Sequence, residues 1–409
     1  MAAKRVAALA VAAALVAGGA GASLAGLSAE VAREPVLGYP SLSEVVDFGL
    51  LERSYACRRA SGSNPALVFG SSELDPAHSG PDHPASLLAG GAHGVDVMVV
   101  GRSFCEDLWQ AIEVGAFAGR ARVERVVLIP SMQWFMCYRK PAQDFQAAFS
   151  EDAYGAFMEN ERISDDLKAR VTRRMADYGV DRREPDSPLE GLAGRIDRAA
   201  ASIAASLRLS AQWDPGSASP VYGPDAPAPA GDPEVPATPG GAAPCWDEVF
   251  SRADARARER AAGNDLGIDD AWSGAKLTRW LAGAQRWRVR DGEYFSREEL
   301  GDFELLLEVC REAGVEPLVL VQPVKGALYD QTVYTREVRA EYYDMVRGAC
   351  ERAGVAVADF SGHEYDTYFL REYSHPSDLG GAYYSKAIYR WFTEGVVDTS
   401  PDRATEGTS

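Results

Sequence analysis

Residues 66–74, Ala-Leu-Val-Phe-Gly-Ser-Ser-Glu-Leu, carry a short apolar run directly into a glycine and two serines. The run from Ala66 to Phe69 suits a buried strand and is too short for a helix. Gly70 lets the backbone turn tightly after it. A serine at such a turn lies at the carboxyl edge of a sheet, where open α/β sheets place their binding sites. The stretch therefore predicts a parallel strand that delivers Ser71 and Ser72 to a site.

Similar short apolar runs recur along the chain and alternate with longer stretches of helical periodicity. This alternation is typical of parallel strands joined by crossover helices, and it predicts the α/β class. We expect four further strands, at Val95–Val100, Val126–Ile129, Pro317–Val321 and Val355–Ala358. The expected helices are Glu106–Gly115, Glu298–Ala313, Thr335–Ala353 and Gly380–Phe392.

A middle region breaks this alternation. Residues 141–296 are dense in Ala, Arg, Asp and Glu with helical spacing, which predicts a helical insertion. Within it, residues 214–244 are rich in Pro, Gly, Ala and Ser, as expected of an exposed linker. The predicted organisation is an N-terminal anchor at 1–28, a catalytic domain formed by 29–140 and 297–397, the insertion with its linker, and a disordered tail at 398–409.

The N-terminus carries a long uncharged apolar run. Val6 to Leu27 is long enough to span a bilayer as a helix, and Lys4 and Arg5 precede it. Basic residues stay on the cytoplasmic side, so we expect a single-pass membrane protein with a cytoplasmic N-terminus and an extracytoplasmic catalytic domain. A cleaved signal peptide is the alternative, because small residues stand near the end of the run. The run exceeds the usual signal core, which favours the anchor.

The charge balance limits the classes of partner. The 409 residues contain 42 basic and 60 acidic side chains, a formal net charge of 42 − 60 = −18. Nucleic-acid binding needs clustered Lys and Arg against the phosphates, so we expect no nucleic-acid partner. A polyanionic partner of any other kind has to be met by a local basic patch.

Six cysteines are spread along the chain, at positions 57, 105, 137, 245, 310 and 350. An even count in an exported chain permits three disulfides, although the sequence does not give their pairing. Free buried thiols are the alternative. The sequence has no CxxC pair and no Cys/His cluster with metal-ligand spacing, so no metal site is predicted.

A second cluster of reactive side chains lies near the C-terminus, in Glu372-Tyr373-Ser374-His375-Pro376-Ser377-Asp378. A carboxylate three residues before a histidine can orient the imidazole, which can then take a proton from a serine. Asp378 is a second candidate partner of His375, although an acidic residue before a helix more often caps it. The remaining histidines are interpreted as solvated loop residues, with ligand contact as the alternative (His78, His83 and His93), or as structural (His363).

Together these blocks resemble known families. Gly70-Ser71-Ser72, followed far along the chain by acid-x-x-His-Pro, is similar to the first and last blocks of SGNH hydrolases, a superfamily of esterases and acyltransferases with a flavodoxin-like three-layer α/β/α sheet. More specific stretches resemble, in order, those of the DltD family: Phe69–Leu74, Ser131–Phe135, Lys325–Asp330, and Ala358–Leu370 with His375. The resemblance covers the anchor, the strands from residue 66 to about 140, and most of residues 298–392.

The resemblance also implies roles for single residues. Aligning Gly70-Ser71-Ser72 with the Gly-Asp-Ser of SGNH enzymes makes Ser72 the nucleophile and leaves Ser71 as a secondary candidate. His375 is the base and Glu372 its partner. The family usually has Asp-x-x-His-Leu-Gly-Trp, whereas this chain has a glutamate and lacks the tryptophan; a glutamate can also orient a histidine.

Two further residues are candidates for stabilising an oxyanion or contacting the substrate. Gly101 follows the second expected strand, and its backbone N–H can act beside that of Ser72. Gln133, in the stretch Ser131–Phe135, offers a side-chain amide. An ordinary turn at Gly101 and a plain helix cap at Ser72 are the alternatives.

The resemblance implies an extracytoplasmic serine acyltransferase or esterase that transfers D-alanine as an ester onto lipoteichoic or teichoic acid, without a metal or organic cofactor. The implied partners are a membrane O-acyltransferase, a D-alanyl carrier protein, the teichoic acid acceptor and the membrane. An extracytoplasmic SGNH-type carbohydrate or polymer esterase is the alternative with the same chemistry. A non-catalytic, membrane-tethered module that binds a carrier or polymer is the alternative from another class; it fails if Ser72 and His375 lie within hydrogen-bonding reach.

Overall fold

The computed structural model describes residues 48–397, apart from residues 61, 63, 76, 77, 89, 90, 92, 138–140, 181–241, 290 and 291. Five parallel strands form one sheet in the order β2-β1-β3-β4-β5. Their bounds are β1 Pro65–Phe69, β2 Asp96–Val100, β3 Arg125–Leu128, β4 Glu316–Val321 and β5 Ala356–Asp359. The five expected strands are confirmed to within one residue at each end, and so is the α/β class.

The strand order places β1 at a functionally important point of the sheet. The chain passes from β1 to β2 on one side and then returns to β3 on the other side. Loops that follow two such strands diverge to opposite faces, and ligands of open α/β sheets bind in the crevice between them. The carboxyl end of β1, which leads to Gly70, therefore lies at the position where open α/β sheets bind ligands. The SGNH-like subclass of the fold stays a prediction.

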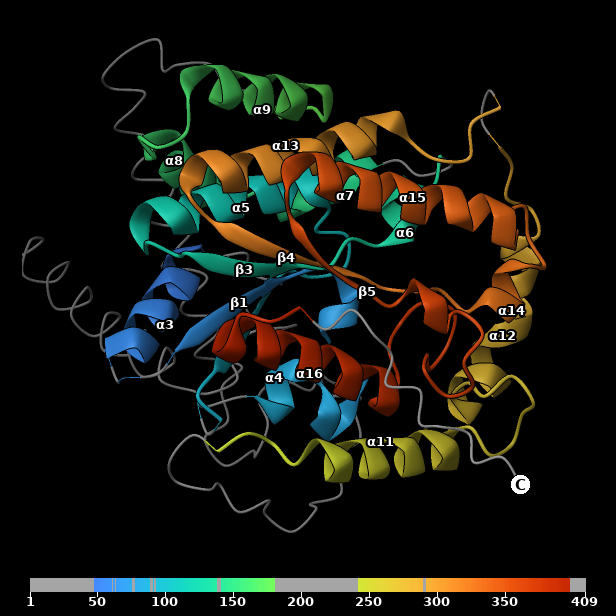
Figure 1. Cartoon of the computed structure of the whole chain (residues 1–409). Coiled ribbons are helices and arrows are strands. Elements are labelled where there is room, and N and C mark those ends of the chain that lie inside the picture. The colour runs from blue at the N-terminus through green and yellow to red at the C-terminus, as the bar shows by residue number, and fades with distance from the viewer. Residues whose placement is uncertain are drawn as a thin grey trace, which may run out of the picture.

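Helices cover both faces of the sheet (Figure 1). Leu67 and Phe69 of β1 share a core with α3 (Phe48–Ala60), α5 (Asp107–Arg120), α13 (Arg297–Ala313) and α15 (Arg336–Ala353). Ala66 and Val68 point the other way, into a core shared with α4 (Pro84–Leu87) and α16 (Asp378–Glu394). Because both faces of the sheet are buried, the strands are apolar apart from charged residues at their ends, namely Asp96, Arg125, Glu316 and Asp359.

The four expected helices correspond to α5, α13, α15 and α16, and α5 is longer than predicted. Its expected end was Gly115, but the helix continues to Arg120. Gly115 lies inside the helix because it allows a close approach of α8 (Glu151–Glu159): a Cβ at this position would stand 2.5 Å from Cδ2 of Phe157. The glycine is thus a packing residue and not a helix end.

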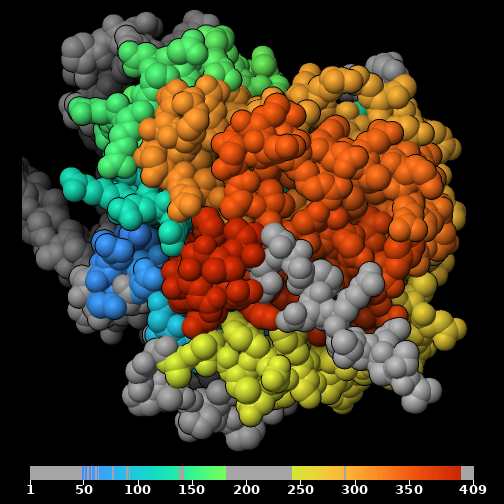
Figure 2. Space-filling model, in the orientation of Figure 1, coloured from blue at the N-terminus to red at the C-terminus, as the bar shows by residue number. Residues whose placement is uncertain are grey.

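The described part of residues 141–296 is mainly helical. Besides α8, it contains α7 Pro141–Ala148, α9 Asp165–Asp177, α11 Trp246–Arg260 and α12 Asp270–Ala284. Helix α11 packs on the C-terminal helix α16 through Val249, Ala253 and Ala382, and Figure 2 shows it in yellow beside the red surface of α16. Most of the predicted linker at 214–244 lies outside the described residues.

The predicted anchor at 1–28 and the predicted tail at 398–409 also lie outside the described residues. Within the part of the chain that is described, none of the helices is both long and apolar enough to cross a membrane.

The cysteines do not form three disulfides. Cys105, Cys245, Cys310 and Cys350 are free thiols, which leaves too few partners for that arrangement. Cys105, Cys310 and Cys350 are buried in the apolar core, where a thiol packs as a small apolar group. Burial raises the pKa of each of these three thiols to about 12.

Candidate active site

Ser72 and His375 lie within hydrogen-bonding distance. Ser72 opens a short 3₁₀ helix, Ser72–Leu74, that follows β1 and Gly70. His375 lies in the loop that precedes α16. The Oγ atom of Ser72 is 2.8 Å from Nε2 of His375, although the two residues are 303 positions apart in the chain. A contact of this length allows a proton to pass between a serine hydroxyl and an imidazole.

The other ring nitrogen of His375 faces Glu372. Nδ1 of His375 is 2.8 Å from Oε1 of Glu372, whose side chain is 4% exposed. The same oxygen accepts hydrogen bonds from the backbone N–H groups of Ser374 (2.9 Å) and His375 (2.6 Å). The carboxylate is thereby held in one position, and it fixes the imidazole so that Nε2 points at Ser72.

The charged forms of Glu372 and His375 stabilise each other. Burial works against ionisation of Glu372, but the neighbouring His375 and the backbone donors outweigh it and hold the pKa of Glu372 below its usual value. Burial likewise disfavours the cation of His375, but Glu372 outweighs burial and raises the pKa of the imidazole above 6.5. An imidazolium that formed during proton transfer from Ser72 would therefore be stabilised.

Gly101 stands directly against the turn that carries Ser72. Its φ is +140°, and a Cβ at this position would lie 2.1 Å from the carbonyl oxygen of Gly70. The backbone N–H of Gly70 donates to the carbonyl of Val100 at 3.3 Å. The ends of β1 and β2 thus approach so closely that no side chain fits at 101, and the backbone of Gly101 lies beside the turn.

Ser71 points away from His375. Its Oγ accepts a hydrogen bond from the backbone N–H of Phe104 at 2.7 Å, and the side chain is buried. Its own backbone N–H donates to Oε1 of the buried Glu73 at 2.5 Å. Ser71 and Glu73 therefore hold the shape of the turn, and of the two serines Ser72 alone contacts the imidazole.

Two other candidates have different partners. Nε2 of Gln133 donates to the hydroxyl of Tyr329 at 3.3 Å, and its amide is not bonded to Ser72 or His375. Asp378 is paired with Arg256 (3.2 Å) and Arg260 (3.3 Å) of α11, and Ser377 caps α16. The suggestion that Asp378 orients His375 is therefore wrong, since Glu372 occupies that place.

The family to which the chain belongs follows from comparison with known proteins. A profile described as "DltD protein" matches residues 51–393, which is more than half of the chain. The chain belongs to the DltD family. Two curated relatives agree: "Protein DltD" of Bacillus subtilis strain 168 is 25% identical over 339 residues, with 81% of this chain and 83% of the relative covered. "Protein DltD" of Staphylococcus aureus strain NCTC 8325 is 23% identical over 332 residues, with 78% and 79% covered.

Membership of the DltD family confirms the resemblance that the motifs indicate. At a general level it supports a role in D-alanylation during lipoteichoic acid biosynthesis, in the cell envelope and within a pathway of Dlt proteins. In the described ranges of this DltD-family chain, no group of three or more His, Cys, Asp or Glu side chains is arranged to hold a metal ion.

The interpretation of His78 and His83 as solvated loop residues is wrong, because both histidines of this DltD-family chain pack close to the site. The ring of His78 stacks on that of His375, with centroids 4.1 Å apart and planes 18° apart. His83 is buried: its Nδ1 accepts from the backbone N–H of Ala85 at 3.1 Å, and its Nε2 is 3.3 Å from the carbonyl of Glu73. The Gly/Pro-rich composition of this loop gives no sign of how closely it packs under the turn that carries Ser72. His93 is half-buried, and its Nδ1 is 2.7 Å from the carbonyl oxygen of Ala242.

The loop that carries His375 is fixed from several sides. Arg371 pairs with Asp269 at 3.3 Å and donates to the carbonyl of His78 at 3.4 Å. The backbone N–H of Lys325, at the start of α14 (Gly326–Tyr329), donates to the carbonyl of Tyr373 at 2.9 Å. Burial lowers the pKa of the Lys325 amine to about 8, and its Nζ donates to the carbonyl of Asp366 at 3.1 Å.

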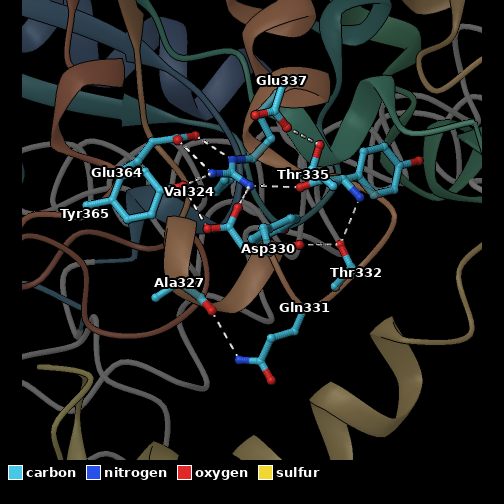
Figure 3. Close-up of polar contacts among 12 residues, drawn as sticks. Val324, Ala327, Asp330, Gln331, Thr332, Thr335, Glu337, Glu364 and Tyr365 are labelled. Atoms are coloured by element: carbon cyan, nitrogen blue, oxygen red, sulfur yellow. Dashed lines mark hydrogen bonds and ion pairs between the residues drawn. The ribbon is translucent and has the colours of Figure 1, made fainter.

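A buried arginine joins two of the motifs that identify the DltD family. Arg339 of α15 is fully buried, and its guanidinium donates to both carboxylate oxygens of Glu364 at 2.7 and 2.8 Å. It also donates to Asp330 at 2.8 Å and to the hydroxyl of Tyr365 at 3.0 Å. Figure 3 shows Asp330, Glu364 and Tyr365 converging on one point. The turn at Lys325–Asp330 and the segment at Glu364 are thereby held together behind the His375 loop.

His363, interpreted as structural, lies in this segment. Its ring stacks on Phe369 at 4.2 Å between centroids, and its Nδ1 is 2.6 Å from Oδ2 of Asp366. Sequence reasoning did not single out Tyr373, Trp272 or Trp280, whose rings pack against one another beside His375. The density of tryptophan in an otherwise polar helical region was the available signal.

Proposed function

We propose that the chain is an extracytoplasmic serine acyltransferase or esterase that transfers D-alanine as an ester onto teichoic or lipoteichoic acid. The observation that carries the proposal is the continuous hydrogen-bonded chain from Ser72 through His375 to Glu372, at 2.8 Å for each contact. Nucleophile, base and orienting carboxylate in this order are the parts of a serine acyl-transfer site.

The first half of the reaction forms an acyl-serine. Nε2 of His375 takes the proton of Ser72 as Oγ bonds to the carbonyl carbon of the D-alanyl donor. The bond from that carbon to the leaving group then breaks, and the leaving group receives the proton from His375. Glu372 keeps the imidazole oriented and stabilises its cation while it holds the proton.

The second half transfers the acyl group. His375 removes the proton of an acceptor hydroxyl, whose oxygen bonds to the acyl carbon, and Ser72 leaves and regains its proton. In a direct variant, the same residues activate the acceptor hydroxyl without an acyl-serine. The backbone N–H groups of Ser72 and Gly101 are the proposed donors to the oxyanion, supported by the contact of Gly101 with the nucleophile turn. No metal or organic cofactor takes part in these steps.

The wider setting of the reaction is part of the proposal. Residues 1–28 anchor the chain in the membrane with the catalytic domain outside, and the catalytic residues belong to an SGNH-like domain formed by 29–140 and 297–397. A membrane O-acyltransferase supplied by a D-alanyl carrier protein provides the D-alanine. Membership of the DltD family and the apolar run at Val6–Leu27 support this setting.

The test is the D-alanine ester content of teichoic acid in cells that carry Ser72→Ala. We expect the ester to be lost while the abundance of the protein in the membrane stays normal. Ser251→Ala is the matched control, because Ser251 is exposed on α11 and is not one of the proposed site residues. An unchanged ester content in Ser72→Ala cells would refute the assignment of Ser72.

A polymer esterase is the second candidate, because the same three residues would use water in place of an acceptor hydroxyl. The purified chain distinguishes the two: release of free D-alanine from an alanylated polymer indicates hydrolysis, and its movement to a second polymer indicates transfer. The binding module is less well supported, since such a module needs no contact between Ser72 and His375.

A further inference from the structure

Helix α12 after its first residue, Asp270, forms, together with the turn that follows, a basic segment in an acidic protein. Residues 271–289 contain four basic side chains and no acidic one, whereas the whole chain has a formal charge of −18. The four, Lys276, Arg279, Arg286 and Arg288, are all exposed. Arg288 donates to the carbonyls of Gln285 and Trp287. None of the four is paired with a carboxylate of the residues that the structure describes, so their charge is available to a ligand.

Several other arginines of the chain pair with carboxylates. On the surface, Arg170 pairs with Glu308 at 2.6 Å and Arg352 with Glu304 at 2.7 Å. The four cations of residues 271–289 lack such partners among the described residues, although the chain has an excess of carboxylates. They are therefore not used to neutralise the protein's own charge. A cluster of them along one helix produces a local positive potential, which attracts anions.

The basic segment lies beside the proposed active site. Trp280 of α12 stacks on Tyr373, with ring centroids 5.0 Å apart and planes 23° apart, and Trp272 is 5.7 Å from the same ring. Tyr373 in turn lies 6.0 Å from the ring of His375. One aromatic ring therefore separates the tryptophans of α12 from the catalytic imidazole. In Figure 1, α12 lies next to α14.

Cations and aromatic rings alternate along this helix. Trp272, Lys276 and Trp280 are spaced by four residues, which places them on the same side of α12. The two tryptophans are half-buried, so part of each residue is accessible to solvent. Such a surface suits a chain molecule in which anionic groups alternate with short carbon segments.

We propose that residues 271–289 are the docking surface for the acceptor polymer, a polyol chain linked by phosphodiesters, which they hold beside Ser72. The proposal rests on the proposed function for the identity of the acceptor. The cations bind the phosphodiesters, and the exposed edges of the tryptophans contact the carbon segments between them. An anionic membrane is the less suitable occupant, because the Trp280 ring is already packed on Tyr373 and Tyr329 and is not free to enter lipid.

The test measures binding in full-length chains that carry Ser72→Ala, so that no turnover interferes. Lys276→Gln, Arg279→Gln and Arg286→Gln are combined in one variant. Arg173→Gln, Arg297→Gln and Arg352→Gln, exposed elsewhere on the described surface, form a control with the same change of charge. Circular dichroism shows whether each variant is folded. The probes are poly(glycerol phosphate), inorganic phosphate, and phosphatidylcholine vesicles with and without phosphatidylglycerol.

We expect the α12 variant to bind poly(glycerol phosphate) at least about tenfold more weakly, and the slope of log affinity against log salt to fall by about 2, because three phosphate contacts are removed. The control variant should bind as the parent does. Equal losses in both variants, unchanged polymer binding, or a loss confined to the phosphatidylglycerol vesicles would overturn the proposal. Failure of the proposed function is recognised separately, since it would leave the ester content of Ser72→Ala cells unchanged.

Discussion

His78 stacks on His375, with the two imidazole rings 4.1 Å apart between centroids and 18° from parallel. Burial, together with the nearby His375 and Arg371, lowers the pKa of His78 well below 6.5, so the ring is neutral when the site operates. Nδ1 of His78 has no hydrogen-bond partner among the described residues. A neutral ring in this position restrains the plane of the His375 imidazole without competing for its proton.

The first prediction concerns this stacking. His78→Ala should reduce kcat for an ester substrate by about tenfold, because the imidazole of His375 can then rotate away from Ser72. His78→Phe should keep most of the activity, since a neutral ring still covers His375. Steady-state kinetics of both variants with a chromogenic ester provide the measurement. A phenylalanine variant as slow as the alanine variant would show that stacking is not the role of His78.

The second prediction is a pH profile. His375 must be neutral to act as a base, so activity should rise with pH through the pKa of His375, which Glu372 holds above 6.5. In Glu372→Gln the imidazolium loses its partner, so this pKa should fall and the rising limb should move to lower pH. The maximal rate should drop by about 10³–10⁴-fold, as for the loss of other orienting carboxylates. The pH dependence of kcat/KM measures both effects, and a limb that stays in place would argue against this pairing.

The third prediction concerns the close approach of two loops. Gly101→Ala should lower the free energy of unfolding by about 2 kcal/mol or more, because its φ of +140° is strained for alanine and its Cβ would meet the carbonyl of Gly70. The rate of reaction with an ester substrate should also fall, because the turn that carries Ser72 must move. Gly301→Ala in α13, where a Cβ meets nothing within 4 Å, should instead raise stability by about 0.5–1 kcal/mol. Urea unfolding distinguishes the two variants.

The fourth prediction concerns the buried arginine. Arg339→Met should lower the free energy of unfolding by about 3–5 kcal/mol, because the buried carboxylate of Glu364 loses its partner. Adding Glu364→Gln should restore part of the loss, since the uncompensated charge is then removed. Arg352→Gln, which breaks a surface pair, should cost less than about 1 kcal/mol. The proposed role of the pair would be wrong if the double variant were no more stable than Arg339→Met in urea.

Local patterns in the sequence predict much of the fold. Strands such as β3 and β4 are short apolar runs between polar segments. Because both faces of these strands are buried, each can be recognised from its own residues. Ser72 was identifiable because a glycine-serine turn follows β1. Glu372 and His375 were identifiable because their spacing of three residues lets both side chains meet within one loop.

Other features depend on contacts between distant parts of the chain. His78 lies in a Gly/Pro-rich loop that looks solvated, and its burial follows from the ring of His375 and from Arg371. Asp378 looks like a partner of His375 until Arg256 of α11 is placed beside it. Gly115 looks like a helix end until Phe157 is packed against it. In each case the deciding neighbour lies too far along the chain for a local pattern to reveal it.

Ser72 and His375 are made at different times while the chain is synthesised. Among the described strands the serine follows the first and the histidine follows the last, so a growing chain carries the proposed nucleophile long before it carries the proposed base. A product that ends before residue 372 would keep Ser72 but hold it as an ordinary, unreactive alcohol. Under the proposed function, therefore, no acyl transfer at Ser72 is expected until synthesis has passed His375.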